Sequence, residues 1–100
     1  MTKYNNKKTM VDDLAFDSKR EAKRYQDLVL MQKAKLIRNL MRQQPFELIK
    51  GVKYIADFTY FDDTKGGEFI IEDVKGFKTD VYKIKKKLMK HFHNVEILET

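Results

Sequence analysis

Two aspartates and a lysine could carry hydrolytic chemistry in this chain if the fold brings them together. Asp57 and Asp73 lie in two β-favouring segments on either side of a turn-forming stretch, and Lys75 follows two residues after Asp73. If the two segments pair symmetrically about residue 65, Asp57 and Asp73 face each other, since each is eight residues from that point. Directly opposed residues have Cβ atoms about 4.5–5.5 Å apart. Lys75 then points to the same face of the sheet as Asp73, because side chains alternate along a strand.

Such a pair of carboxylates requires a nearby positive charge, because like charges directly opposite on a sheet are destabilising. A salt bridge to Lys75 is one source, and a bound cation is the other. Mg²⁺ favours carboxylate oxygens, and a metal ion both activates a bound water and stabilises charge on a phosphoryl oxygen. Lys75 could orient that water or stabilise the developing negative charge. The same short pattern also arises by chance on solvated hairpins, so both interpretations stay open at this point.

The elements that must position these residues form a predicted β-hairpin. Residues 53–61 are rich in aromatic and β-favouring types, which predicts a strand. Residues 62–67 are typical of a turn, with two aspartates followed by two glycines at their end. Residues 68–75 predict the returning strand, which Gly76 ends.

The rest of the chain predicts two helices and two further strands. Ser18 and Glu21 fit a capping box, which indicates a helix from Ser18 to about Ala34. A strand is expected somewhere in 40–50, with Pro45 at a sheet edge or near a strand end because proline lacks a backbone donor.

A second helix is predicted over residues 79–91, and a short last strand over 95–98. The helix has an apolar stripe that we expect to face the core; the stripe consists of Val81, Ile84, Leu88 and Phe92. The element order is then helix, three strands, helix, strand. It predicts a single α/β domain in which helices pack on a small mixed sheet.

The composition indicates a globular protein with an anionic partner. Hydrophobic residues make up 42% of the 100 residues and the net charge is +6. DNA, RNA and a membrane surface are all partners that would match this charge, and simple solubility is the alternative interpretation. There are no cysteines, which excludes disulfides, cysteine zinc sites and thiol nucleophiles. No apolar run is long enough for a transmembrane helix or a signal peptide. We therefore expect a soluble, cytoplasmic protein.

Lysines are concentrated in and just before the second predicted helix, where they could bind phosphates without reading sequence. A solvated helix face is the alternative interpretation of such a cluster. Residues 1–15 form a predicted flexible basic arm that could add contacts, and residues 16–100 form the predicted domain. The candidate DNA-binding residues of the helix region are Lys78, Lys83, Lys86, Lys87 and Lys90.

Several segments resemble the PD-(D/E)XK nuclease superfamily, and most closely a small phage family of unassigned function within it. Tyr54-Ile55-Ala56-Asp57-Phe58, followed after a hairpin by Glu72-Asp73-Val74-Lys75-Gly76, resembles the superfamily's core. Phe16-Asp17-Ser18-Lys19-Arg20-Glu21-Ala22 resembles that family's opening. The resemblance extends over residues 16–98 and implies a restriction-endonuclease-like αβββαβ core. It departs at Ala56, which replaces the proline of the motif.

The resemblance also implies a role for each matching residue. Asp57, Asp73 and Glu21 would bind Mg²⁺, with Mn²⁺ as the other option, together with the backbone carbonyl of Val74. Lys75 would serve the attacking water. Glu21 also has a purely structural alternative, because a capping-box glutamate bonds back to the start of its own helix.

The expected function is a metal-dependent endodeoxyribonuclease, acting on branched DNA such as Holliday junctions in phage replication or recombination. Cutting both strands needs two active sites, so a homodimer is expected, in the host-cell cytoplasm if the chain is phage-encoded. The alternative is a non-catalytic DNA-binding accessory protein that retains the nuclease fold.

Overall fold

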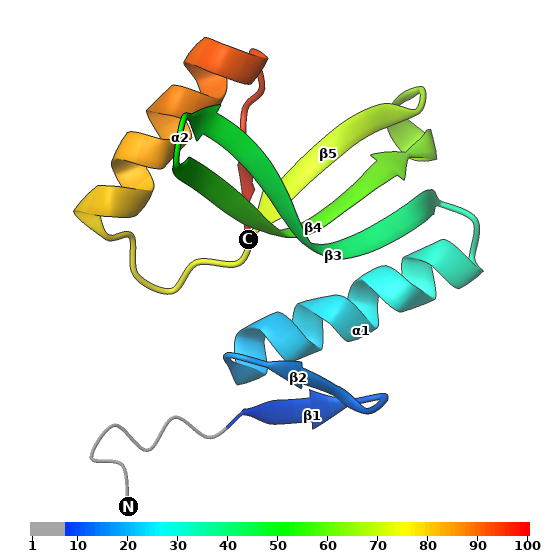
Figure 1. Cartoon of the computed structure of the whole chain (residues 1–100). Helices are drawn as coiled ribbons and strands as arrows, with labels where there is room; N and C mark the ends of the chain where they lie inside the picture. Colours follow the sequence, from blue (N-terminus) through cyan, green and yellow to red (C-terminus); the bar gives the residue numbers. More distant parts are fainter. Residues whose placement is uncertain (1–7) are drawn as a thin grey trace, which may run out of the picture.

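The computed structural model describes residues 8–100 and shows an α/β domain with a mixed four-stranded sheet (Figure 1). The strands lie in the order β3-β4-β5-β6; β5 and β6 are parallel, and the other neighbours are antiparallel. From α1 onward the element order is the predicted αβββαβ, with one 3₁₀ turn added. The elements of this core are α1 (Lys19–Lys33), β3 (Ile37–Ile49), β4 (Val52–Asp62), η1 (Asp63–Lys65), β5 (Glu68–Asp73), α2 (Asp80–His93) and β6 (Leu98–Glu99).

Both helices begin at side chains that bind free backbone amides of the first turn. The Ser18 hydroxyl accepts from the amide of Glu21 at 3.0 Å, and the Thr79 hydroxyl accepts from the amide of Tyr82 at 3.1 Å. The second helix ends at Asn94, whose φ of 54° is the left-handed conformation common after a helix. The predicted helix boundaries are therefore confirmed to within a few residues.

The two helices pack at different parts of a long, bent β3–β4 hairpin (Figure 1). Two apolar clusters result. The first joins α1 to the hairpin through Phe16, Leu28, Ile37, Phe58 and Tyr60. The second joins α2 to it through Leu48, Tyr54, Ile71, Tyr82 and Met89.

β3 is one of the two edge strands of the sheet and is longer than predicted. It carries Pro45, as expected for a residue without a backbone donor. Its pairing with β4 shifts between Arg38 and Met41. Asn39 and Gln43 both have positive φ, 58° and 51°. Bulges of this kind bend a strand and redirect its side chains.

Residues Thr9–Phe16 form a hairpin of β1 (Thr9–Val11) and β2 (Leu14–Phe16) rather than an irregular arm. Asp12 and Asp13 provide the two positive-φ positions of its turn, 51° and 64°. The hairpin packs against α1, because Val11, Leu14 and Phe16 bury apolar surface there. Residues 1–7 of the predicted arm, including Lys3 and Lys7, lie outside the described residues.

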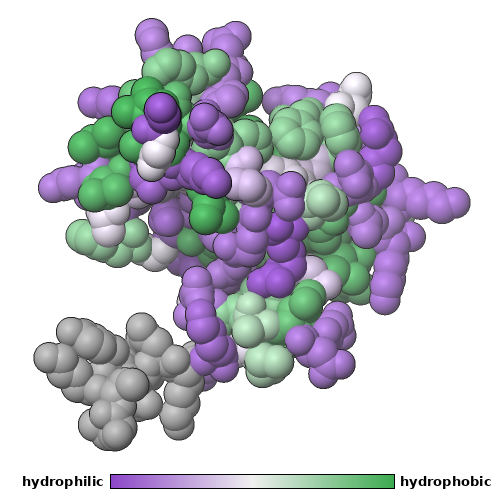
Figure 2. Space-filling model, in the orientation of Figure 1, coloured by the Kyte–Doolittle hydropathy of each residue, from purple (hydrophilic) through white to green (hydrophobic). Residues whose placement is uncertain are grey.

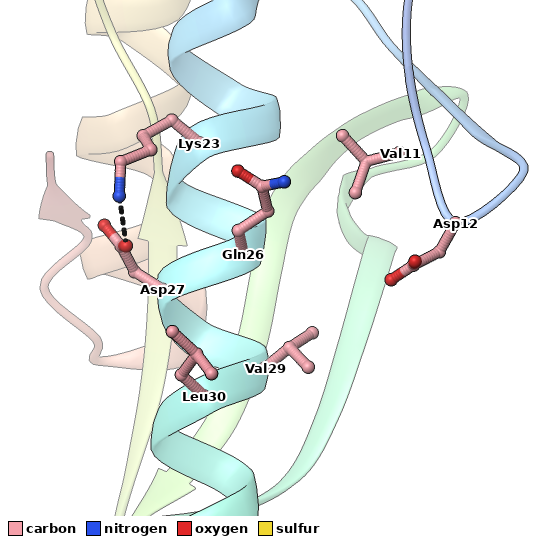
Figure 3. Close-up of a pocket in the computed structure, with 7 residues that line it drawn as sticks. All are labelled: Val11, Asp12, Lys23, Gln26, Asp27, Val29 and Leu30. Carbon is pink, nitrogen blue, oxygen red and sulfur yellow. Dashed lines mark hydrogen bonds and ion pairs between the residues drawn. The ribbon is translucent and has the colours of Figure 1, made fainter.

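A shallow hollow lies between this hairpin and α1, lined by Val11, Asp12 and the outer face of the helix (Figure 3). Lys23 and Asp27 form an ion pair at 2.6 Å on successive turns of α1 (Figure 3). The hollow contains none of the predicted site residues.

The prediction that an apolar stripe of α2 faces the core is largely wrong. The buried residues of the helix are Tyr82 and Met89, whereas Val81, Ile84 and Phe92 are 61%, 58% and 47% exposed. A polar ring hydroxyl allows tyrosine to pack its ring and still bond at its tip. The helix therefore uses Tyr82 for the core and leaves most of its aliphatic side chains outside.

A buried carboxylate joins α1 to β5. Glu72 has no exposed surface and accepts from Arg24 Nε at 2.6 Å and Nη2 at 3.0 Å. The Tyr60 hydroxyl donates to it at 2.6 Å and the Thr100 hydroxyl at 2.9 Å. Both oxygens are hydrogen-bonded and Arg24 provides the counter-charge, which offsets the cost of burying the carboxylate.

No helix within the described range 8–100 is long and apolar enough to cross a membrane.

Replacing Arg24 by alanine should strongly destabilise the protein. It would leave Glu72 buried without its counter-charge, a change that costs about 3–5 kcal/mol in free energy of unfolding. Urea denaturation followed by circular dichroism measures this. Lys23→Ala is the matched control on the same helix, because its pair with Asp27 is exposed and is worth about 0.5 kcal/mol or less. Equal effects of the two substitutions would contradict the structural role given to Glu72.

Candidate functional site at the end of the β4–β5 hairpin

The register of the β4–β5 hairpin is the predicted one. Phe58 pairs with Glu72 and Thr59 with Ile71, which is symmetric about residue 65. One residue further, the same register sets Asp57 opposite Asp73, where the ladder ends. There the Val74 amide donates to Asp57 Oδ2 at 2.8 Å, so the Asp57 side chain reaches across to the end of β5.

Asp73 is buried, and its two oxygens have different surroundings. Oδ2 accepts a 2.6 Å hydrogen bond from the Tyr54 hydroxyl. Oδ1 lies 3.0 Å from Lys75 Nζ, but outside hydrogen-bonding geometry, and it has no hydrogen-bond partner among the described residues. Within residues 8–100, Oδ1 is thus ion-paired with Lys75 but accepts no hydrogen bond, so it could accept a further donor or a cation.

Lys75 is held on the same face as Asp73, as the alternation of strand residues predicts. Its ammonium also lies 4.4 Å from the centre of the Tyr82 ring, a cation–π contact. The neighbouring Val74 points the other way and packs against the α1 cluster. Asp73 and Lys75 thus face α2, while Glu72 and Val74 face α1.

The two aspartates interact electrostatically. Burial, together with the charges of Asp73 and Glu21, raises the pKa of Asp57 to about 7, although the hydrogen bond from the Val74 amide lowers it. A carboxyl whose pKa is raised by burial and like charges is typical of a functional site. The same arrangement gains from a bound cation, because positive charge removes the repulsion.

Glu21 enters this site from α1. It is buried, and burial raises its pKa, as do the charges of Asp17 and Asp73, while Arg42 lowers it. Gln43 Nε2 donates to it at 3.2 Å. Gln43 has a left-handed backbone. Its neighbours Arg42 and Gln44 pair with Phe58 and Ala56. The register therefore sets Gln43 opposite Asp57.

Only one of the two hydrogen bonds of the predicted capping box is present. Ser18 does cap the helix by accepting from the Glu21 amide. The Glu21 carboxylate, however, bonds across to Gln43 on β3. The side chain is thereby turned toward the sheet.

The predicted set of three carboxylates is not gathered into a single cation site. Within residues 8–100 there is no group of three or more histidine, aspartate or glutamate side chains arranged to hold a metal ion. Asp57 and Asp73 remain as two acids that influence each other electrostatically, with the Val74 carbonyl at the same strand end. Mg²⁺ commonly binds one or two carboxylates and retains several waters, so this smaller set still fits such an ion.

Asp73 and Lys75 line a depression between the sheet and α2. Glu21 lines a separate one with Lys8, Asp17 and Arg42. Sequence patterns did not identify Tyr54, Lys53 or Lys85 as site residues, because each belongs to an ordinary aromatic or basic segment. The other residues around the Asp73 depression are Lys53, Tyr54, Ile55, Thr79, Val81, Tyr82 and Lys85.

All five lysines proposed to bind DNA line one groove along α2, together with Glu96 and Glu99. Three of them are paired: Lys78 and Lys86 contact Glu99 at 2.8 and 3.1 Å, and Lys90 contacts Glu96 at 3.4 Å. Hydrogen bonds from Lys78 and Tyr82 lower the pKa of Glu99 to about 2. The groove is therefore less positive than a count of its lysines suggests.

The raised pKa of Asp57 predicts a specific pH dependence of stability. Between about pH 4 and 7 the unfolded chain ionises Asp57 while the folded chain still holds its proton, so stability falls as pH rises. Asp57→Asn should remove this loss and raise the free energy of unfolding at pH 8, measured by urea denaturation without added metal. Asp12→Asn, at an exposed turn position, is the control. If Asp57→Asn is no more stable than the parent at pH 8, the repulsion is absent.

The comparisons with known proteins place the chain in one family. No curated protein and no solved structure matches it. One family matches over residues 1–99, and its description is "Protein of unknown function (DUF1064)". Because the match extends over almost the entire chain, the protein belongs to the DUF1064 family.

Proposed function

We propose that the protein is a metal-dependent endodeoxyribonuclease of the PD-(D/E)XK type. The observation that carries the proposal is the strand end where Asp57 and Asp73 meet, with Lys75 Nζ 3.0 Å from Asp73 Oδ1. The order of helices and strands around it is the one that the resemblance implies.

In this proposal Asp57, Asp73 and the Val74 carbonyl hold Mg²⁺ or Mn²⁺. The bound ion would supply an activated water and neutralise charge on the phosphate. Tyr54 holds Asp73 in place through its 2.6 Å hydrogen bond. Lys75 donates to the negative charge that develops on the phosphate oxygens.

Glu21 has a supporting role. Its negative charge helps to raise the pKa of Asp57, and Gln43 holds its carboxylate on the α1 side of the strand end. A cation at the aspartate pair would be stabilised by this charge even without a direct bond.

The groove along α2 would bind the phosphates of the DNA. Cutting both strands requires two such sites, which favours a homodimer. Its proposed substrate is branched DNA in phage replication or recombination, and its proposed location is the cytoplasm of the host cell. The DNA-binding role of the groove is proposed from its lysines and the net charge of the chain, and the homodimer and the branched substrate are proposed from the resemblance to the nuclease superfamily.

A non-catalytic DNA-binding accessory protein is the second candidate. The observation that favours it is that Glu21 does not join the aspartates in one metal-holding group among residues 8–100. In this case DNA binding would need no metal, and no substrate would be cut.

Cleavage of labelled linear, nicked, flapped and four-way DNA tests the proposal directly. With Mg²⁺ or Mn²⁺ we expect cutting that EDTA abolishes. Asp73→Asn and Lys75→Ala should each reduce the rate at least about 100-fold, because each removes a group that contacts the ion or the reacting phosphate. The matched controls are Asp63→Asn and Lys65→Ala in the exposed 3₁₀ turn at the other end of the hairpin. Cleavage by Asp73→Asn at the parent rate would show that the site is wrongly assigned.

Salt dependence tests the α2 groove separately. Lys83 and Lys87 form no ion pair within residues 8–100, so each should be free to contact a phosphate. Alanine at either position should reduce the slope of log affinity against log salt by about 1, measured by fluorescence anisotropy in EDTA. Lys86→Ala should have a smaller effect, since Lys86 is bound to Glu99. An unchanged slope in both Lys83→Ala and Lys87→Ala would remove the groove from the DNA interface.

A further inference from the structure

Exposed apolar side chains gather beside the Asp73 depression. Phe77, in the loop between β5 and α2, is 80% exposed. Val81 and Ile55, which are also largely exposed, line the depression itself. Hydrophobic surface is visible over α2 and the loop before it (Figure 2). Single exposed apolar residues are common, but a group of them beside a candidate site indicates a binding surface.

The same surface is basic. Lys53 and Lys85 line the depression with Lys75. Among residues 8–100 the only acid that lines it is Asp73, which is paired with Lys75. The ligand that matches this surface carries negative charge and also presents apolar faces.

Single-stranded nucleic acid has both properties, since each nucleotide carries one phosphate and one aromatic face. In a duplex the faces of the bases are stacked inside, and only the base edges and the backbone can be contacted. An acidic amphipathic helix would also combine charge with apolar surface. The proposed function favours nucleic acid over such a helix, because it assigns Asp73 and Lys75 to a phosphate and its metal ion.

We propose that this surface binds an unpaired segment of nucleic acid, with phosphates on Lys53 and Lys85 and a base stacked on Phe77. Phe77 lies in a bend between Lys75 and Thr79, which both line the depression. In this proposal its exposed ring contacts a nucleotide next to the phosphate at Lys75. The inference rests on the proposed function for its choice of DNA, and it names unpaired bases near the cleaved bond as the feature recognised.

Fluorescence anisotropy of the full chain tests the surface in EDTA, with labelled oligothymidine and a blunt duplex of the same length as probes. Phe77→Ala should weaken oligothymidine binding about tenfold, in the range measured for loss of one stacked base. It should change duplex binding less than twofold, and Phe77→Trp should restore the single-strand affinity. Phe92→Ala is the matched control, because Phe92 is an exposed phenylalanine at the far end of α2.

Unchanged oligothymidine binding by Phe77→Ala would overturn the inference, as would an equal loss of duplex binding or the same loss in Phe92→Ala. Cleavage does not contribute to this measurement, because EDTA is present throughout. A protein that loses single-strand affinity in Phe77→Ala but cuts no substrate would keep the binding surface and refute the nuclease. If the parent protein cuts DNA and Phe77→Ala binds oligothymidine as tightly as the parent, the nuclease would stand and the single-strand surface would be refuted.

Discussion

The candidate site depends on how β5 divides its charged residues between two sides of the sheet. Glu72 and Asp73 are adjacent, both are buried, and strand geometry turns them to opposite faces. Glu72 is neutralised by Arg24 and bonded on both oxygens, which ties α1 to the centre of the sheet. Asp73 has only Tyr54 and the nearby Lys75. One carboxylate is thus fully satisfied and structural. Its neighbour keeps one oxygen that is ion-paired with Lys75 but accepts no hydrogen bond from residues 8–100.

The arrangement at the strand end is unfavourable for the protein alone. Asp57 and Asp73 repel each other, Glu21 adds to the negative potential, and burial reduces the screening that water would provide. The fold accommodates this by bonding each carboxylate to one fixed donor: Val74 for Asp57, Tyr54 for Asp73 and Gln43 for Glu21. Positive charge near these carboxylates would reduce their repulsion. The apolar clusters on either side offset the local loss of stability.

The basic residues around α2 have two different settings. Along one side the lysines are partly neutralised by Glu96 and Glu99, which limits general attraction for phosphates. On the other side Lys53 and Lys85 stand beside Asp73 and among exposed apolar side chains. α2 therefore lies between a groove whose lysines are partly ion-paired and a depression where lysines unpaired within residues 8–100 stand among exposed apolar side chains.

Local physical rules allowed much of this to be predicted from sequence. The Asp-Asp and Gly-Gly ends of the β4–β5 turn centre the hairpin, so the register that opposes Asp57 and Asp73 followed from counting residues. Ser18 and the 79–91 periodicity similarly located the helices. Only the tertiary structure decided which face of α2 is buried, because Tyr82 hides its ring while its hydroxyl bonds Glu99, and an aliphatic pattern cannot indicate that choice. It also decided that Glu21 bonds Gln43, since that contact depends on a left-handed residue in β3 that no local pattern predicts.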